Sequence, residues 1–195
     1  MSQFIESIRL ENGVVHNLNY HQERVNKTFL HIFKMPANFS LEKIISENKF
    51  PKQGLFKIRI VYDSHQQSIE FAEYTRPKFH TYKLVEIEKN FTYSFKSTDR
   101  KLFDTISQET DKNTLPILIQ NKNVSDSVFS NLIFEKNGNL YSPNTPLLFG
   151  TMLSQSLQQH KINMITIKED EVKNFDYIYP INAMNPLGAI EKIKI

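Results

Sequence analysis

The sequence predicts an α+β protein built from two small lobes. Short β-rich runs and apolar stripes at helical spacing follow one another along the 195 residues. The pattern breaks at Thr75-Arg76-Pro77-Lys78, where a proline stands among polar residues. We therefore expect a small N-terminal α/β lobe over residues 1–76 and a larger C-terminal lobe over residues 77–195.

Three β-rich runs are expected to form the sheet of the first lobe. They are Met1–Leu10, Leu55–Tyr62 and Ser68–Tyr74. The turn Glu11-Asn12-Gly13 follows the first run and leads to a further strand, because Asn-Gly favours a tight hairpin.

Two helices are expected between these strands. Asn19 followed by Gln22 resembles a capping box, which predicts a helix start. The helix is supported by a stripe of apolar side chains at helical spacing, namely Val25, Phe29, Ile32 and Phe33. Ser40 is the expected N-cap of a shorter second helix.

The second lobe is expected to contain more strands than helices. The predicted strands are Tyr82–Ile87, Leu115–Gln120, Val128–Phe134, Ile162–Ile167 and Asp176–Ile181. The predicted helices are Asp99–Gln108 and Gly150–His160.

Composition excludes several classes of function. The net charge of +3 is small, and no basic run is interleaved with aromatic residues, so we do not expect a nucleic-acid partner. Zero cysteines exclude disulfides, thiolate metal sites and a cysteine nucleophile. The histidines are scattered without metal-ligand spacing, so no metal site is expected. Without an N-terminal signal pattern or a long apolar run, we expect a cytoplasmic protein and no membrane partner.

Four segments in the second lobe carry the candidate chemistry. In chain order they are Phe95-Lys96-Ser97-Thr98-Asp99-Arg100, Val124-Ser125-Asp126 with Ser130-Asn131-Leu132-Ile133-Phe134, Gly150-Thr151-Met152, and Ile181-Asn182-Ala183-Met184-Asn185-Pro186-Leu187. In this order they resemble the class IV aminotransferase family, the fold-type IV enzymes that use pyridoxal 5′-phosphate (PLP). The similarity is closest to the aminodeoxychorismate lyases within it. The resemblance implies a two-lobed, D-amino-acid aminotransferase-like fold whose N-terminal lobe is shortened.

By this resemblance, Lys96 is the catalytic lysine that binds the PLP aldehyde covalently and later moves protons at the substrate Cα. Taken alone, without the other segments, Lys96 would be interpreted as a solvated surface lysine. Asp126 takes the position of the family's glutamate beside the pyridine nitrogen, with a side chain one methylene shorter. The local sequence alone also allows an Asx-turn at Asp126.

Three further segments are assigned to the cofactor by the same resemblance. Gly150, Thr151 and Met152 open a helix whose N-terminus can bind the PLP phosphate. Arg24, in a His-x-x-Arg sequence, can bind the phosphate with two parallel hydrogen bonds. The turn at Asn182 and Ala183 has the lyase-like form and is expected to approach the phosphate and the substrate.

The substrate-binding residues depart from the family pattern. Relatives have a substrate-facing arginine after the strand at 56–62, and this chain has Val61 or Tyr62 near that place. Arg59 is a candidate carboxylate anchor, although strand alternation puts it on the face opposite Tyr62.

Three functions remain open from the sequence. The first is a lyase that releases 4-aminobenzoate and pyruvate, a step toward folate. The second is a transaminase acting on branched-chain or D-amino acids. The third is a degenerate family member that binds a ligand without turnover. Family resemblance also implies a homodimer that acts on a small amino-acid-like substrate.

Overall fold

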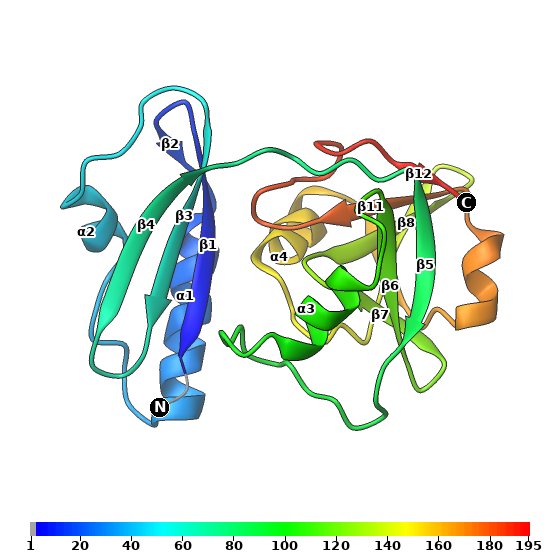
Figure 1. Ribbon diagram of the computed structural model, residues 1–195, viewed down its shortest axis with the longest axis horizontal. Helices are drawn as coiled ribbons and strands as arrows, with labels where there is room; N and C mark the ends of the chain where they lie inside the picture. Colours follow the sequence, from blue (N-terminus) through cyan, green and yellow to red (C-terminus); the bar gives the residue numbers. More distant parts are fainter. Residues whose placement is uncertain (1–2) are drawn as a thin grey trace. The chain divides into compact units, whose positions relative to one another are not determined.

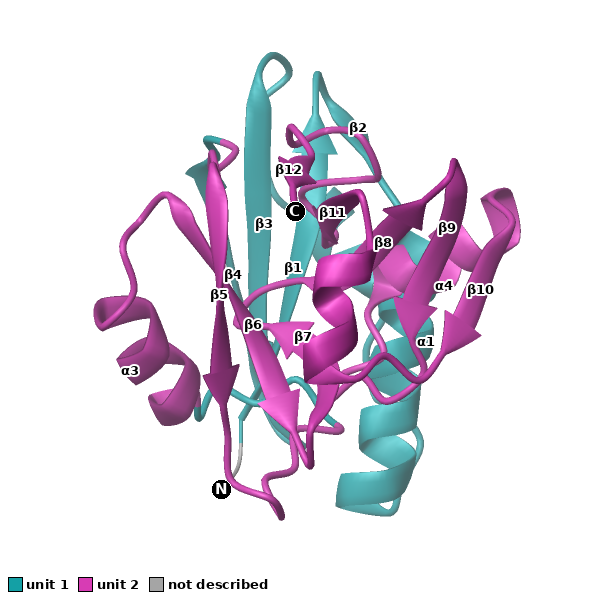
Figure 2. Cartoon of the chain, turned by 90° about the vertical axis from the view of Figure 1, so that its right-hand side faces the viewer, with its two compact units in different colours: residues 1–75, 95–99 teal, residues 76–94, 100–195 magenta. Residues whose placement is uncertain are grey.

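The computed structural model describes residues 3–195, which form two compact units. Unit 1 comprises the described residues up to Thr75 together with Phe95–Asp99, and unit 2 comprises Arg76–Ser94 and Arg100–Ile195 (Figure 2). The sequence-based division at residues 76 and 77 differs in one respect that matters for function. The segment Phe95–Asp99, which carries Lys96, belongs to unit 1.

Unit 1 is a four-stranded antiparallel sheet in the order β2-β1-β3-β4, with α1 packed along one face (Figure 1). Its elements are β1 (Phe4–Glu11), β2 (Val14–Val15), α1 (Leu18–Thr28), a π-helical turn (Phe29–Phe33), α2 (Leu41–Ser46), β3 (Leu55–Tyr62) and β4 (Gln67–Glu73). The predicted strands are confirmed over the described residues, and Met1 and Ser2 of the first run lie outside them. Asn12 and Gly13 both have positive φ, at 50° and 80°, as the hairpin between β1 and β2 requires.

The capping box expected at Asn19 is wrong. The helix α1 begins at Leu18, so Asn19 lies inside its first turn, and Asn17 is the N-cap with a φ of 58°. Gln22 does not cap the helix; its side-chain oxygen accepts a hydrogen bond of 2.8 Å from the backbone N–H of Leu41. This bond joins α1 to the start of α2.

Of the four side chains in the predicted apolar stripe, all but Ile32 pack in or against the core of unit 1. Val25 and Phe29 are fully buried, whereas Ile32 is 40% exposed. The chain leaves the α-helix at Phe29 and forms a wider π-helical turn, which changes the side-chain phase. Phe33 therefore packs against the core instead of Ile32. Ser40 caps α2 as predicted, since its hydroxyl accepts from the N–H of Lys43.

Unit 2 contains two sheets and two α-helices. Its elements are β5 (Thr81–Glu86), α3 (Lys101–Gln108), β6 (Thr114–Gln120), β7 (Asn123–Ser127), β8 (Asn131–Lys136), β9 (Asn139–Pro143), α4 (Thr151–Gln159), β10 (Ile162–Ile165), a 3₁₀ turn (Glu169–Asn174), β11 (Tyr177–Ile181) and β12 (Ile193–Lys194). The sheet orders are β5-β6-β7 and β10-β9-β8-β11-β12. A shared core cluster contains Ile117 and Ile119 from the first sheet and Phe134 and Ile178 from the second.

Most predicted elements of unit 2 are confirmed, with one correction near the candidate site. The strand expected over Val128–Phe134 begins only at Asn131, and residues 128–130 form a turn closed by a hydrogen bond from Ser127 N to Ser130 O. Asp126 lies before this turn, inside β7, which the sequence did not predict. The buried residues Met152 and Leu153 pack α4 against Ile133 and Ile181 of the larger sheet.

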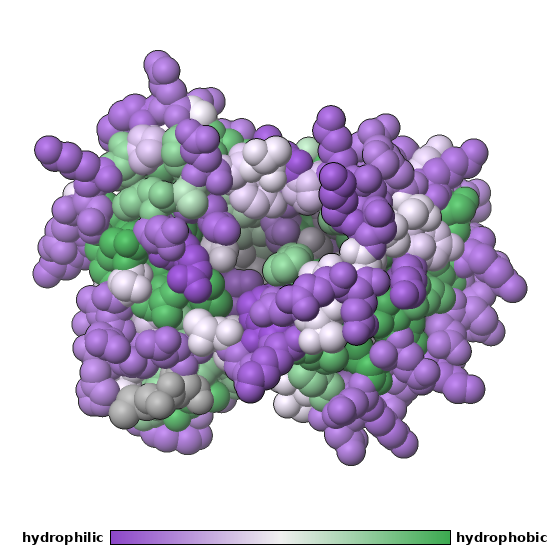
Figure 3. All heavy atoms as spheres, viewed as in Figure 1, coloured by the Kyte–Doolittle hydropathy of each residue, from purple (hydrophilic) through white to green (hydrophobic). Residues whose placement is uncertain are grey.

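Hydrophilic residues predominate on the face of the protein shown in Figure 3. Within residues 3–195 we find no helix that is both long and apolar enough to cross a membrane.

The core of unit 1 provides the first test of this fold. Ile8 is fully buried among β1, β3 and α1, so we expect Ile8→Ala to lower the free energy of unfolding by about 2–5 kcal/mol. Val14 is 56% exposed, and Val14→Ala should change it by less than about 0.5 kcal/mol. Chemical denaturation of both variants measures the difference. Equal losses would contradict the assignment of Ile8 to the core.

Candidate active site

Lys96 is held against the edge of β1. The N–H of Ile5 donates to the carbonyl oxygen of Lys96 at 2.9 Å, and the N–H of Thr98 donates to the carbonyl oxygen of Gln3 at 2.9 Å. Phe4 and Ser97 form an antiparallel bridge between these bonds. A short extended segment is thus added to the sheet of unit 1, so the backbone of Lys96 is fixed by strand pairing.

Beside this segment, β1 and α1 enclose a buried charged cluster. Glu6 lies at a core-facing position of β1 and is fully buried. Arg24 binds its carboxylate with two hydrogen bonds, Nε to Oε1 at 2.9 Å and Nη2 to Oε2 at 2.5 Å. The Nδ1 atom of the buried His21 lies 2.5 Å from Oε2 of the same carboxylate. Both partners come from the His-x-x-Arg sequence of α1.

The pKa values show which member of this cluster is charged. Burial raises the pKa of Glu6, but the Arg24 guanidinium and the bond from His21 overcome this effect and lower the pKa to about 2. Burial lowers the pKa of His21, and the nearby charges of Arg24 and Lys96 act in the same direction. The cluster is therefore a Glu6–Arg24 ion pair with a neutral histidine, whose Nδ1–H donates to Glu6.

In unit 2, Asp126 is buried on β7 without a cationic partner. Its Oδ1 accepts from Nδ2 of Asn131 at 2.8 Å, and its Oδ2 accepts from the N–H of Leu148 at 3.0 Å. Burial raises the pKa of Asp126 to about 7, although these hydrogen bonds lower it. Among residues 3–195 no charged side chain contributes to this shift. The Asx-turn alternative is wrong, because Asp126 lies within a strand.

This carboxylate fits a protonated pyridine nitrogen. A buried acid is costly to ionise unless a positive charge compensates it, and the described part of the chain supplies none at Asp126. A carboxylate can accept about four hydrogen bonds, and the described chain supplies donors from Asn131, Leu148 and, with the smallest effect, Leu147. Capacity therefore remains for one cationic N–H donor from a ligand.

Asn131 connects Asp126 to the start of α4. Besides its bond to Asp126, its Nδ2 donates to the carbonyl oxygen of Leu148 at 2.9 Å, and its Oδ1 accepts from the N–H of Gly150 at 3.1 Å. Gly150 leaves no room for a side chain, since a Cβ atom there would lie 2.2 Å from Oδ1 of Asn131.

The helix α4 offers an anion-binding end. Its first intrahelical bond is donated by Ser154 to the carbonyl oxygen of Gly150 at 3.0 Å. The N–H groups of Met152 and Leu153 precede it and have no acceptor within the helix. Together with the helix dipole, such a terminus suits a phosphate. Thr151 and Met152 are buried, so their side chains anchor this end of α4 in unit 2.

Asn182 belongs to the same part of unit 2. Its Nδ2 donates to the carbonyl oxygen of Phe129 at 3.1 Å and to the hydroxyl of Ser130 at 3.2 Å. Its Oδ1 accepts from the N–H groups of Met184 and Asn185, which closes the turn that contains Ala183. The turn is therefore tied to the loop that follows Asp126.

The two substrate candidates lie on opposite faces of β3. Tyr62 is 2% exposed and its ring stacks on Phe29 in the core of unit 1, which leaves no surface for a substrate. We therefore correct its expected substrate contact to a structural role. Arg59 is opposite Ser7 in register and lies on the other face, as strand alternation predicts.

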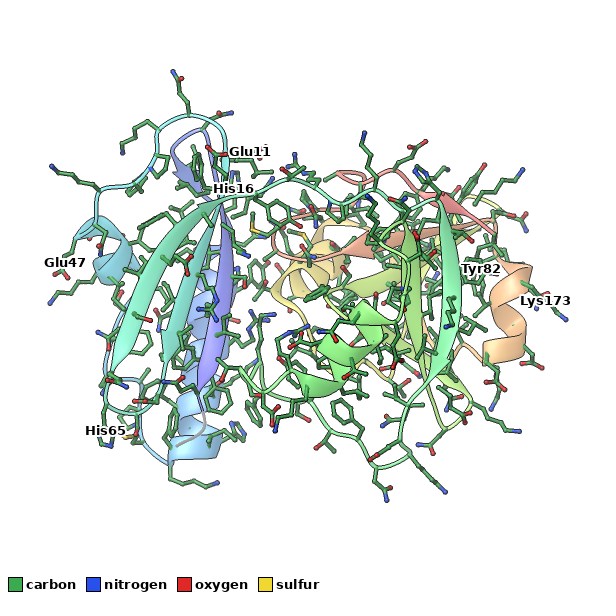
Figure 4. All side chains as sticks on the ribbon, viewed as in Figure 1. Glu11, His16, Glu47, His65, Tyr82 and Lys173 are labelled. Atoms are coloured by element: carbon green, nitrogen blue, oxygen red, sulfur yellow. The ribbon has the colours of Figure 1, made fainter. Side chains whose placement is uncertain are left out.

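The described residues contain no cluster of three or more acidic, histidine or cysteine side chains that could hold a metal ion. Figure 4 shows the wide separation of two histidines of unit 1, with His16 near Glu11 at the β1–β2 turn and His65 at the β3–β4 turn.

Sequence reasoning missed two residues that organise these sites. Glu6 and Asn131 lie in recognised segments, but we assigned neither a role. The signal for Glu6 was an acidic residue in phase with Phe4, Ile8 and Leu10 on the buried side of a strand. Asn131 is five residues after Asp126, and no local pattern reveals that it also reaches the loop before Gly150.

A comparison with protein families identifies residues 3–193 as amino-transferase class IV. The chain belongs to the class IV aminotransferase family. This match spans both units and includes Arg24, Lys96, Asp126 and the start of α4. The family resemblance drawn from the four segments is therefore confirmed, and with it membership in a family of PLP-dependent enzymes.

Individual relatives agree with this membership. An uncharacterized protein of Haemophilus influenzae is 34% identical over 189 residues, which cover 96% of this chain and 100% of the relative. A crystal structure from Haemophilus somnus 129pt, provisionally named a 4-amino-4-deoxychorismate lyase, is 31% identical with a TM-score of 0.88, covering 96% of this chain and 98% of that one. A Brucella abortus aminotransferase bound to PLP has a TM-score of 0.76 at 16% identity, covering 99% of this chain and 80% of that one. The last likeness shows the fold alone.

Gly150 provides a test of the α4 terminus. We expect Gly150→Ala to displace Asn131, because the new methyl group would overlap its side-chain oxygen. The variant should lose at least about 1–3 kcal/mol of stability and bind inorganic phosphate more weakly. Denaturation and phosphate titration by NMR measure both effects. Gly138→Ala is the control for the phosphate titration only, since Gly138 lies outside α4 and its φ of 74° strains any side chain and so affects stability by itself. Phosphate binding unchanged in Gly150→Ala would contradict this site.

The raised pKa of Asp126 predicts how the stability of the protein depends on pH. Its carboxyl group keeps a proton in the folded protein up to about pH 7, whereas the unfolded chain loses it near the model value of 3.8. The protonated Asp126 therefore contributes its full share to the free energy of unfolding below about pH 4. This contribution is lost as the pH rises to about 7, and the loss is on the order of 4 kcal/mol. Asp126→Asn removes this loss, so the variant should gain stability relative to the natural protein between pH 4.5 and 7.5.

Denaturant unfolding at several pH values measures that difference. Asp170→Asn, at an exposed position of the 3₁₀ turn, is the matched control and should follow the natural protein at every pH. If Asp126→Asn also follows the natural protein, the carboxyl group is not buried as described.

Proposed function

We propose that this chain is a PLP-dependent lyase that converts aminodeoxychorismate to 4-aminobenzoate and pyruvate. The observation that carries the proposal is the similarity to the Haemophilus somnus protein along almost the full length of both chains. The lyase-like sequence Asn182-Ala183-Met184-Asn185-Pro186 adds support. A cytoplasmic homodimer supplying a folate precursor is part of the proposal by family resemblance.

The residues of unit 1 are assigned to holding the cofactor. Lys96 is the residue that we assign to the covalent bond with PLP, and its strand pairing to β1 fixes the backbone from which the amine extends. Arg24 is assigned to the phosphate. Its Nε and Nη2 bind Glu6, which holds the guanidinium in one orientation.

The residues of unit 2 are assigned to the ring nitrogen and the phosphate. Bound PLP supplies an electron-withdrawing ring that stabilises negative charge at the substrate Cα. Asp126 keeps the ring nitrogen protonated, because a buried carboxylate favours a cation beside it. The N-terminus of α4, from Gly150 to Met152, and the turn at Asn182 and Ala183 contribute hydrogen-bond donors.

In the proposed reaction, the amine of Lys96 removes the proton from the substrate Cα, the bond to the enolpyruvyl oxygen breaks, and the proton is passed to the departing group, which leaves as pyruvate. Loss of pyruvate then leaves the aromatic ring of 4-aminobenzoate. Arg59 is the candidate anchor for a substrate carboxylate. We find no ion pair to it among residues 3–195, so its guanidinium is available for a bidentate contact.

Chemical trapping tests the assignment of Lys96. Borohydride reduction of the PLP-loaded protein, followed by proteolysis and mass spectrometry, should locate the cofactor on Lys96. Lys96→Ala should lose the adduct and at least about 10³-fold in turnover, because no other group is assigned to the covalent bond. Lys89→Ala is the control, since Lys89 is exposed and outside the assigned residues. An adduct on another lysine would contradict the assignment.

Turnover assays separate the reactions. The protein is supplied with aminodeoxychorismate, and 4-aminobenzoate and pyruvate are measured. A second assay supplies D-alanine or leucine with 2-oxoglutarate, and glutamate is measured. Product only in the second assay would replace the lyase by a transaminase. A PLP-loaded protein inactive in both would support the degenerate alternative.

A further inference from the structure

An exposed aromatic side chain lies on the rigid loop after Asp126. The loop consists of residues 128–130, and each of them is held through its backbone. Arg100 donates from Nη2 to the carbonyl oxygen of Val128 at 2.7 Å, and Asn182 donates to that of Phe129 at 3.1 Å. The carbonyl oxygen of Ser130 accepts from the N–H of Ser127 at 2.8 Å. Even so, Phe129 is 58% exposed.

Arg100 supports the ring of Phe129 from one side. The central carbon of its guanidinium lies 4.6 Å from the centre of the Phe129 ring and 4.8 Å from the centre of the Phe103 ring. Arg100 is itself fixed, since it bonds to the carbonyl oxygen of Val128 and to the hydroxyl of Tyr93. Contacts between an arginine and aromatic faces are favourable. The Arg100 guanidinium therefore helps to hold the Phe129 ring in place.

This arrangement is suited to ligand binding rather than to stability. An exposed phenyl ring contributes little hydrophobic free energy to folding. A rigid aromatic ring, however, offers a large contact area with little loss of conformational entropy when a ligand binds. The same loop connects Asp126 to Asn131, which bonds to Gly150 at the start of α4. The ring therefore belongs to the segment that carries the proposed partner of the pyridine nitrogen.

We propose that Phe129 is a stacking platform for a planar ring bound at this site, and that Arg100 is the positioning residue of that platform. The inference rests on the proposed function and adds a residue that recognises the ligand. Two rings have the required shape and π-face. One is the pyridine ring of PLP, and the other is the benzenoid ring of the aromatic product.

The test measures the dissociation constant of each ring separately. PLP is titrated by its absorbance, and 4-aminobenzoate is titrated by NMR against the protein with and without PLP. Loss of a stacked aromatic side chain weakens ring binding by about 5- to 150-fold, so Phe129→Ala should weaken at least one ligand by this factor. Phe129→Tyr should remain within about threefold, because it keeps the ring.

Two further variants separate stacking from folding. Arg100→Lys loses the planar guanidinium and its bond to Val128, so it should weaken the same ligand in the same direction by a smaller factor. Leu84→Ala removes a partly exposed apolar side chain elsewhere in unit 2 and should change neither constant. Thermal unfolding of Phe129→Ala should match that of the natural protein, because the ring is exposed.

The outcomes distinguish this inference from the proposed function. Weaker binding of PLP alone identifies the cofactor ring as the occupant, and weaker binding of 4-aminobenzoate alone identifies the product ring. If the natural protein binds no PLP, the proposed function fails, while the 4-aminobenzoate titration still tests the platform. The platform is overturned if Phe129→Ala binds both ligands as the natural protein does, or if the natural protein binds neither.

Discussion

The geometry of the unit 2 site depends on the side chain of Asn131. Its amide nitrogen bonds to Asp126 on β7 and to the carbonyl oxygen of Leu148, and its amide oxygen accepts from Gly150. One buried side chain thus joins a strand, the start of the next strand and the loop before α4. Because each bond uses a different lone pair or hydrogen, no shorter or non-amide side chain can make all three. These three hydrogen bonds of Asn131 therefore fix the position of the α4 N-terminus relative to the Asp126 carboxylate.

Unit 1 has a corresponding constraint in Glu6. A buried carboxylate would be costly alone, but Arg24 supplies the opposite charge and His21 supplies a neutral donor. The guanidinium is consequently held in one orientation, with one edge occupied by Glu6. An arginine fixed in this way loses little side-chain entropy when it binds an anion, which is the property that a phosphate ligand requires.

Local pattern predicted most of the fold, and tertiary contacts account for what it missed. The strands β1, β3, β4 and β6 alternate or run apolar as strands do, and the Ser40 cap is a local signal. Ile32 was wrongly predicted to be buried, because the π-helical turn changes which side chains face the core. No residue type in this segment predicts such a turn. The strand β7 was missed because Asn123-Val124-Ser125-Asp126-Ser127 has few β-forming residues. Pairing with β6 and burial in unit 2 determine its conformation instead.

The candidate site was predicted as a set of residue types but not as a set of contacts. The sequence pointed to Lys96, Asp126 and Gly150 through the family resemblance. It could not show that the Lys96 segment joins the sheet of unit 1, because that depends on pairing with β1 across about 90 residues. It also suggested Tyr62 as a substrate contact, since burial cannot be read from a tyrosine at a strand end.

The aspartate at position 126 stands where the family resemblance places a glutamate, and its contacts are consistent with that resemblance. A shorter side chain is less free to swing, and here both oxygens already accept a hydrogen bond from the chain. These bonds fix the orientation of the carboxylate, while burial keeps its pKa near 7. A carboxylate in that condition gains more from a cationic N–H donor than an exposed one would, because the donor removes a charge imbalance in a region of low dielectric. In the function that we propose, the Asp126 carboxyl group therefore keeps its capacity for a ring nitrogen, although its side chain is one methylene shorter than that of a glutamate.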